Sequence, residues 1–213
     1  MDYRQLFIDV SDSITRNIHL IVLKNDIGEP VPSDDLSYEL ALRRFNIVLF
    51  QKLLDLYYSV GYYHIEWECN LKDHVEIAKF HPDDTVVSGQ IVIRTLDEML
   101  EFDKKMEADW WVKNLDSEEK ISLYDFRYFD FNDDDTRVGY ILQQNAIIEK
   151  EFYFITQGAQ GFYPANLNFE AYLKTMTMYK GYQGWQKNHF FQNTTNYKRM
   201  IHYLSQLFND KIA

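Results

Sequence analysis

Apolar residues recur along the chain with the spacing of helices in some segments and of strands in others, and the order of these segments constrains the fold more than any other feature. Apolar residues recur at steps of three and four over residues 3–23, which predicts a first amphipathic helix. A longer helix is expected to begin near Ser33–Asp35, where short polar side chains can cap free N–H groups, and to end at Gly61. The same spacing returns over residues 168–180 and 196–209, so two further helices close the chain.

Strands are predicted between these helices. Tyr63, Ile65 and Trp67 alternate with charged or polar residues, the period of a half-buried strand. Residues 86–94 predict another strand, with Gly89 as a turn or bulge. Three apolar runs separated by short polar turns then predict an antiparallel meander: residues 126–131, 137–143 and 147–156. Helices before and after a run of strands favour an α+β fold with helices packed on an antiparallel-rich sheet.

Polar signals mark the remaining boundaries. Residues 25–32 have the composition of a loop. Thr95 and Glu98 have the spacing of a capping box, which opens a helix expected to reach about Met106. No linker is long enough to force two domains. One α+β domain with helical extensions is therefore expected, in three segments: an N-terminal helix and loop over 1–33, the domain over 34–185 and a C-terminal helix packed on it over 186–213.

Charge and composition limit the possible partners. The formal net charge is −11, and it is unevenly spread: residues 1–150 carry 16 basic and 30 acidic side chains, whereas residues 151–213 carry 6 and 3. A nucleic-acid binder would present a basic face to phosphate, so nucleic acid is not an expected partner. Aromatic residues make up 16% of the chain, which excludes intrinsic disorder. The acidic segment is expected to attract a cationic partner, or to serve only as a solubilising surface.

The location expected from sequence is the cytoplasm. Cys69 is the single cysteine, which excludes an internal disulfide and any paired-cysteine motif. The apolar run over residues 18–23 is too short to span a bilayer, so no membrane association is expected. Acidic residues precede that run and no small-residue cleavage site follows it, which argues against a signal peptide.

Motifs for catalysis or metal binding are missing from the sequence. It contains no Walker loop, GxGxxG, GxSxG or HExxH pattern, and its six histidines never pair at ligand spacing on one helix face. The run from Asp130 to Asp135 fails the EF-hand pattern because Asp135 stands where glycine is needed and Ile141 where glutamate is needed. A polar hairpin turn explains that run without an ion. We therefore expect no enzyme activity, no cofactor and no metal.

Three stretches in a fixed order resemble the SUKH superfamily, also described as the Smi/Knr type. In Leu54–Trp67, Tyr58 matches the helix aromatic, Gly61 the turn and Trp67 the strand tryptophan. Residues 89–100 resemble the strand and helix that follow in the family. Residues 126–185, with a helix starting at Asn168, resemble its C-terminal part. The chain departs from the pattern at Val60, where asparagine is usual, and in the added segment 101–125.

The resemblance implies an α+β fold and a binding role that is not catalytic. Bacterial members of the superfamily often serve as immunity proteins that neutralise toxins, and fungal members regulate cell-wall glucan synthesis. The favoured hypothesis is an immunity protein whose partner is a basic toxin domain. The alternatives are a regulatory or scaffold protein linked to glucan synthesis and a ligand-binding protein. The candidate partner contacts are acidic and aromatic residues: Asp130, Asp133, Asp134, Asp135, Glu66, Glu68, Trp110 and Trp111.

Overall fold

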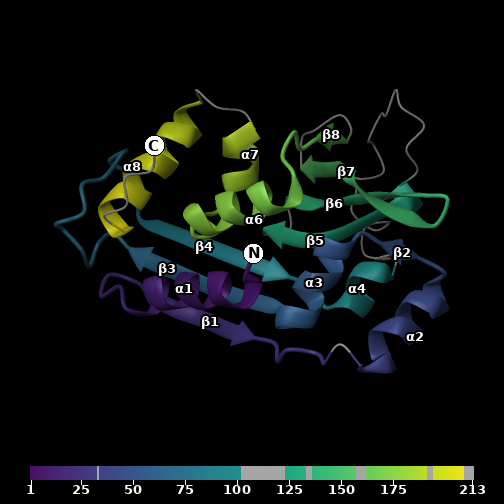
Figure 1. The fold of residues 1–213 in the computed structure, drawn as a ribbon. Coiled ribbons are helices and arrows are strands. Elements are labelled where there is room, and N and C mark those ends of the chain that lie inside the picture. Colours follow the sequence, from purple (N-terminus) through teal and green to yellow (C-terminus); the bar gives the residue numbers. More distant parts are fainter. Residues whose placement is uncertain (33, 102–122, 133–135, 157–161, 191–193, 209–213) are drawn as a thin grey trace.

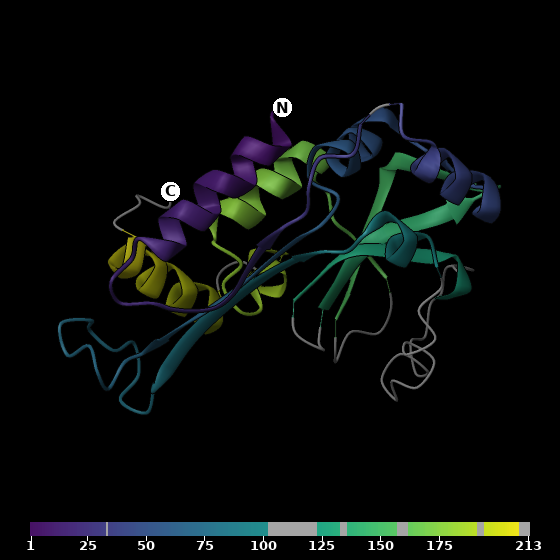
Figure 2. The ribbon, with the colours of Figure 1, turned by 90° about the horizontal axis from the view of Figure 1, so that it is seen from below.

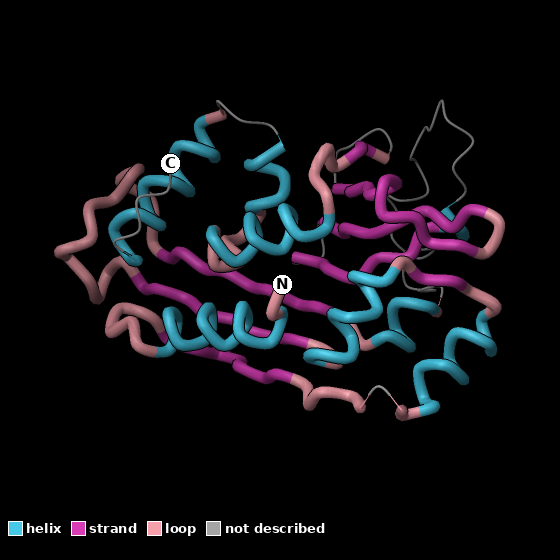
Figure 3. The backbone as a smooth tube through the Cα atoms, in the orientation of Figure 1, coloured by secondary structure: helices cyan, strands magenta, loops and turns pink. Residues whose placement is uncertain are grey.

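The fold is a curled sheet with helices packed on it, as the computed structural model of the chain shows (Figures 1 and 3). The structure describes residues 1–32, 34–101, 123–132, 136–156, 162–190 and 194–208. Within these residues the strand order is β1-β3-β4-β5-β6-β7-β2, with β8 paired to β7. All neighbours are antiparallel except β2 and β7. The predicted α+β class is confirmed.

The first helix is shorter than the sequence predicts. Helix α1 spans Tyr3–Thr15, begins at an Asp2 cap that accepts a hydrogen bond from the Gln5 amide, and ends at Arg16. The predicted continuation to residue 23 is wrong, because strand β1 occupies Ile21–Ile27 and pairs antiparallel with β3. The apolar residues after Arg16 keep a helical spacing. From Ile21 onward, however, their backbone groups pair with β3 and not within a helix.

The second predicted helix is two helices. Helix α2 covers Leu36–Phe45, and its cap Asn46 has a left-handed backbone with φ of 53°. Asparagine tolerates this conformation, which ends the helix. The short strand β2, Val48–Leu49, follows and pairs with β7, and helix α3 then covers Gln51–Val60 before Gly61.

The predicted meander is confirmed. Its strands are β5, Phe126–Asn132, β6, Thr136–Gln143, and β7, Ala146–Thr156, and they pair antiparallel in sequence order. Gln144 and Asn145 form the turn between β6 and β7, both with positive φ, as a tight hairpin needs. The short β8, Tyr163–Pro164, adds to the outer side of β7.

The sheet continues on its other side through two long strands. Strand β3 spans Tyr63–Asn70 and β4 spans Val86–Ile93, and they pair in unbroken register. The predicted turn or bulge at Gly89 is therefore wrong, since Gly89 stands within the strand opposite Trp67.

The remaining helices follow their sequence signals at their starts. Thr95 and Glu98 form the predicted capping box at the start of α4, Leu96–Leu100, and the expected continuation to Met106 lies outside the described residues. A short 3₁₀ helix η2 covers Leu123–Asp125. Three helices close the chain: α6 over Phe169–Met178, α7 over Trp185–Phe190 and α8 over Thr195–Phe208. Helix α7 was not predicted.

The main hydrophobic core lies between the helices and one face of the sheet. It runs from Tyr3 in α1 to Leu207 in α8, so both terminal segments share the core of the segment between them. A smaller apolar cluster occupies the other face of the meander, with four buried members: Phe126, Tyr128, Ile141 and Ile155. Figure 2 shows α1, α6 and α8 together on one side of β3 and β4. The opposite side of these strands faces away from those helices.

Candidate functional site

The candidate site is the face of β1, β3 and β4 that points away from α1, α6 and α8, here called the open face. Along β3, Tyr63, Ile65 and Trp67 are buried in the core, whereas His64, Glu66 and Glu68 alternate with them and are half-buried. This alternation matches the predicted period of two and places Glu66 and Glu68 on one face.

Hydrogen bonds fix one carboxylate of the open face. Glu66 Oε1 lies 2.5 Å from His64 Nε2, on the same strand, and accepts a hydrogen bond of 2.8 Å from Gln90 Nε2 on β4. On β1, Lys24 stands opposite Glu66 in the strand register. The Lys24 Nζ lies 3.8 Å from Asp26 Oδ2 and forms an ion pair with it. Asp26 also accepts a hydrogen bond from the Tyr62 hydroxyl, which raises the pKa of that phenol.

Glu68 has a different environment. It stands opposite Ser88 on β4 and Ile21 on β1, and among the described residues it makes no hydrogen bond or ion pair. Together with Asp26 and Glu66 it gives the open face three carboxylates against the single ammonium of Lys24. The face is therefore net acidic.

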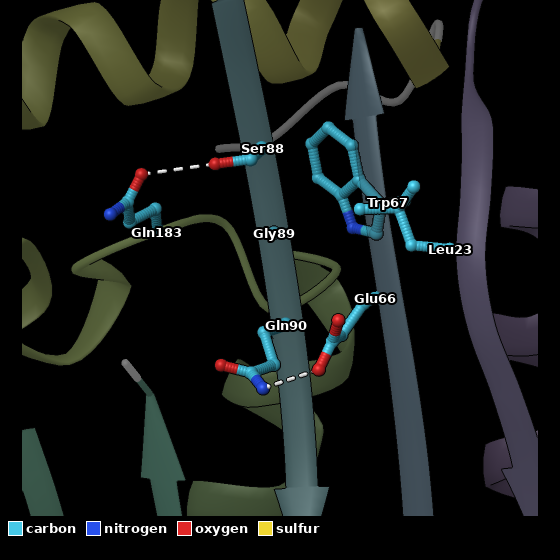
Figure 4. Close-up of a pocket in the computed structure, with 7 residues that line it drawn as sticks. All are labelled: Leu23, Glu66, Trp67, Ser88, Gly89, Gln90 and Gln183. Carbon is cyan, nitrogen blue, oxygen red and sulfur yellow. Dashed lines mark hydrogen bonds between the residues drawn. The ribbon is translucent and has the colours of Figure 1, made fainter. Parts of the chain in front are cut away.

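A shallow pocket of about 210 Å³ opens on this face (Figure 4). Gly89 forms part of its floor, where the absent side chain lets the Trp67 ring lie against the backbone. The Trp67 Nε1–H donates a hydrogen bond of 2.7 Å to the Lys180 carbonyl, which holds the ring in place. The lining combines apolar and polar groups: Leu23, Glu66, Trp67, Ser88, Gly89, Gln90 and Gln183. The Glu66 carboxylate and the exposed Leu23 side chain can contact the charged head and the apolar stem of a cationic side chain.

Strand β1 forms the edge of the sheet next to this pocket. Among the described residues it is the terminal strand and pairs only with β3, and its register shifts between Val22 and Lys24. Ile21 is 53% exposed and Leu23 is 58% exposed. Exposed apolar side chains on an edge strand are an established way for a sheet to accept a protein partner.

Asp130, a predicted contact, lies in the interior instead. It is 1% exposed, and its carboxylate accepts hydrogen bonds from the Tyr172 hydroxyl and, at 3.2 Å, from Gln186 Nε2. Burial raises the pKa of this carboxyl to about 6. The register of β5 shifts between Tyr128 and Asp130, which turns the side chain toward the core. We therefore do not count Asp130 among surface contacts.

The remaining predicted contacts fall outside the described residues. These are Asp133, Asp134 and Asp135, which lie between β5 and β6 in the sequence, and Trp110 and Trp111, which follow α4 in the sequence. Of the eight predicted contacts, the structure thus places only Glu66 and Glu68 together on an exposed face.

One group of side chains that the sequence did not indicate can hold a metal ion. His19, His74 and Glu76 bring three ligand atoms close together from two separate loops. His19 lies 55 residues from His74, and neither belongs to a helix, so no spacing rule pointed to them.

Comparison of the chain with protein-family models, curated proteins and solved structures finds no significant match in any of the three. No helix within the described residues has both the length and the apolar character needed to cross a bilayer. The fold and the site define the chain as an α+β protein with an acidic, partly apolar open sheet face.

Proposed function

We propose that the protein is a non-catalytic binding protein of the immunity type, which neutralises a basic toxin domain by covering it with the open face. The observation that carries this proposal is that Asp26, Glu66 and Glu68 share the open face, which points away from the packed helices, and that Glu66 also lines the pocket beside the exposed Leu23 side chain. The resemblance of residues 38–185 to the SUKH superfamily supports the same role.

Electrostatics favour a cationic partner. Toxins that cleave nucleic acid present basic residues to phosphate, and carboxylates can compete for those residues. Glu68, free of described partners, is available to pair with a lysine or arginine. Glu66 is held by His64 and Gln90, so it offers a fixed acceptor. Fixed acceptors cost less side-chain entropy on binding than mobile ones.

Apolar contact would supply the remaining affinity. Charged pairs at the rim of an interface contribute mainly to association rate and specificity, whereas buried apolar anchors contribute most of the binding energy. Ile21 and Leu23 provide such anchors beside the carboxylates. An aromatic or aliphatic side chain of the partner packed on them would complete a mixed interface.

The test is binding to, and protection from, toxin domains. The full chain is mixed with purified basic nuclease toxin domains, and binding is measured by calorimetry while toxin activity is followed on its substrate. Co-expression in a toxin-producing cell measures protection. We expect a stable complex with one toxin and loss of its activity. If the protein binds no toxin encoded by a neighbouring gene and protects no cell that produces such a toxin, the proposal is wrong. Purification with a stable cellular partner that is not a toxin would favour the regulatory alternative.

A further inference from the structure

Three ligand atoms converge at one end of the sheet, away from the pocket of the open face. His19 Nδ1 lies 3.3 Å from His74 Nδ1 and 3.1 Å from Glu76 Oε1, and His74 Nδ1 lies 3.2 Å from the same oxygen. His19 comes from the turn between α1 and β1, whereas His74 and Glu76 come from the loop between β3 and β4. The two imidazole rings meet edge to face, at an interplanar angle of 85°.

Hydrogen bonds can satisfy only two of the three contacts among these atoms at once. Each Nδ1 carries at most one proton, and an ionised carboxylate carries none. If both Nδ1–H groups donate to Glu76 Oε1, the 3.3 Å contact between the two nitrogens is not a hydrogen bond. If one nitrogen donates to the other, one of the two contacts with Oε1 loses its hydrogen. A cation at the centre would instead accept lone pairs from all three atoms at once.

The spacing fits a first-row transition metal. With metal–ligand bonds of about 2.0–2.1 Å, two ligand atoms of a tetrahedral site stand about 3.3–3.4 Å apart. The three observed separations, 3.1 to 3.3 Å, are close to this value. Two imidazoles and one carboxylate suit zinc and its neighbours, whereas magnesium and calcium require oxygen ligands.

We propose that His19, His74 and Glu76 form a binding site for a zinc-type divalent metal ion. Three protein ligands leave a fourth tetrahedral position for water or for a group from a partner. The site is open enough for exchange, because the side chain of Glu76 is 54% exposed and those of the two histidines about a quarter exposed. His19 also borders a surface hollow of about 370 Å³ next to the end of α8.

Both loops of the site are held by α8. In the β3–β4 loop, the Ala78 amide donates to Gln206 Oε1 at 2.8 Å, and the Phe80 amide donates to the Tyr203 hydroxyl at 2.9 Å. On the other side, Asn17 Nδ2 donates to the Leu207 carbonyl at 2.5 Å. The ligands are therefore carried on segments fixed by a third element. Ligands that the surrounding structure holds in place distinguish a built metal site from a chance meeting of side chains.

The experiment is a zinc titration of the full chain, purified without a histidine tag and treated with a chelator. Calorimetry with Zn²⁺ alone should give one site per chain, and Co²⁺ alone should produce the visible absorption of a tetrahedral centre. Zinc should also raise the thermal unfolding midpoint, because a ligand that binds only the folded chain stabilises it. Loss of groups that merely support metal ligands lowers affinity about 10–100-fold, so His74→Gln and Glu76→Gln should each lower it at least about 10-fold.

Matched variants keep the test decisive. His81→Gln removes a histidine from the same loop, where the side chain is 64% exposed and lies near Asp83. His64→Gln removes the histidine that contacts Glu66 on the open face. Both should bind zinc as the wild type does. The proposal is overturned if wild-type protein binds no zinc at micromolar concentrations, if both ligand variants bind it unchanged, or if only His81→Gln or His64→Gln abolishes binding.

Discussion

The indole ring of Trp67 lies against the backbone of Gly89 on the neighbouring strand. The two residues are register partners in β3 and β4, and a Cβ atom at Gly89 would stand 2.4 Å from Cε2 of the ring. The contact joins three parts of the fold, because the same indole donates its hydrogen bond to the Lys180 carbonyl after α6. The glycine is therefore required by a close approach within the sheet, and its backbone has no positive φ.

Replacement of Gly89 by alanine should destabilise the protein. The added methyl group would overlap the ring of Trp67, a residue that is 1% exposed and whose indole is held by its hydrogen bond to the Lys180 carbonyl. Overpacking of this kind costs about 1–3 kcal/mol in the free energy of unfolding, measured by urea denaturation.

A double-mutant cycle separates overlap from other effects of alanine. Trp67→Phe shortens the ring system, so Gly89→Ala should cost less in that background than in the wild type. Equal costs in both backgrounds would show that the Trp67 ring is not the obstacle.

Local sequence signals predicted most elements but not all of their ends. The capping box at Thr95 and the asparagine cap at Asn168 are formed by neighbouring residues, and both helices start as expected. The end of α1 and the break at Asn46 depend on pairing of β1 and β2 with distant strands. A periodic pattern carries no information about such partners, which lie tens of residues away.

The residues of the candidate site also divide into those that a local sequence pattern places and those that only the folded chain brings together. Glu66 and Glu68 lie on one face because a strand alternates, which a sequence reveals. The Asp130 side chain points into the core because of a register shift in β5, which no sequence pattern predicts. His19 and His74 meet only through the packing of two loops on α8. Contacts across 55 residues require the folded topology, so this metal site could not be predicted from spacing.

The buried carboxyl of Asp130 should make stability depend on pH. Its pKa in the folded state is about 6, above the ordinary value of 3.8, so the folded state binds the proton more tightly than the unfolded state. Stability from this group is fully present below about pH 4 and is lost as the pH rises toward 6, by up to about 3 kcal/mol.

Asp130→Asn should remove this dependence, because the amide stays neutral and can still accept a hydrogen bond from Tyr172. Relative to the wild type, the variant should therefore gain stability between pH 4 and pH 7 in urea denaturation. Asp9→Asn, on the exposed side of α1, is the control and should follow the wild-type curve. A difference between Asp130→Asn and the wild type that stays constant with pH would contradict the prediction.

The Tyr203 hydroxyl should be a main support of the β3–β4 loop. It accepts from the Phe80 amide at 2.9 Å and donates to Asp84 Oδ2 at 2.5 Å. Burial alone would raise the pKa of the Asp84 carboxyl, but hydrogen bonds from Tyr203 and the His81 amide, with the nearby Arg199, hold it below its usual value.

Tyr203→Phe leaves both partners without this hydroxyl and should cost about 1–3 kcal/mol. Limited proteolysis should cleave the loop faster, and zinc affinity should fall if the loop positions His74 and Glu76. Tyr58→Phe is a suitable control, because among the described residues the Tyr58 hydroxyl makes no hydrogen bond. If both phenylalanine variants show wild-type stability and cleavage, the hydroxyl does not support the loop.

Reversal of the charges at Glu66 and Glu68 should weaken binding of a basic partner. The double variant Glu66→Lys, Glu68→Lys changes the charge of the open face by four while leaving Ile21 and Leu23 in place. Like-charge repulsion at an interface slows association, so the association rate at low salt should fall about 10-fold or more. Stopped-flow or surface-based kinetics with the toxin domain, repeated across salt concentrations, measures this effect.

The control applies the same change of charge elsewhere. Asp9→Lys, Glu39→Lys alters two exposed positions on α1 and α2, which lie outside the open face. If the open face is the interface, this control should keep most of the wild-type association rate, since long-range steering falls off beyond a Debye length of about 10 Å. Equal losses in the two variants would mean that net charge alone governs association, and the open face would then no longer be supported as the binding surface.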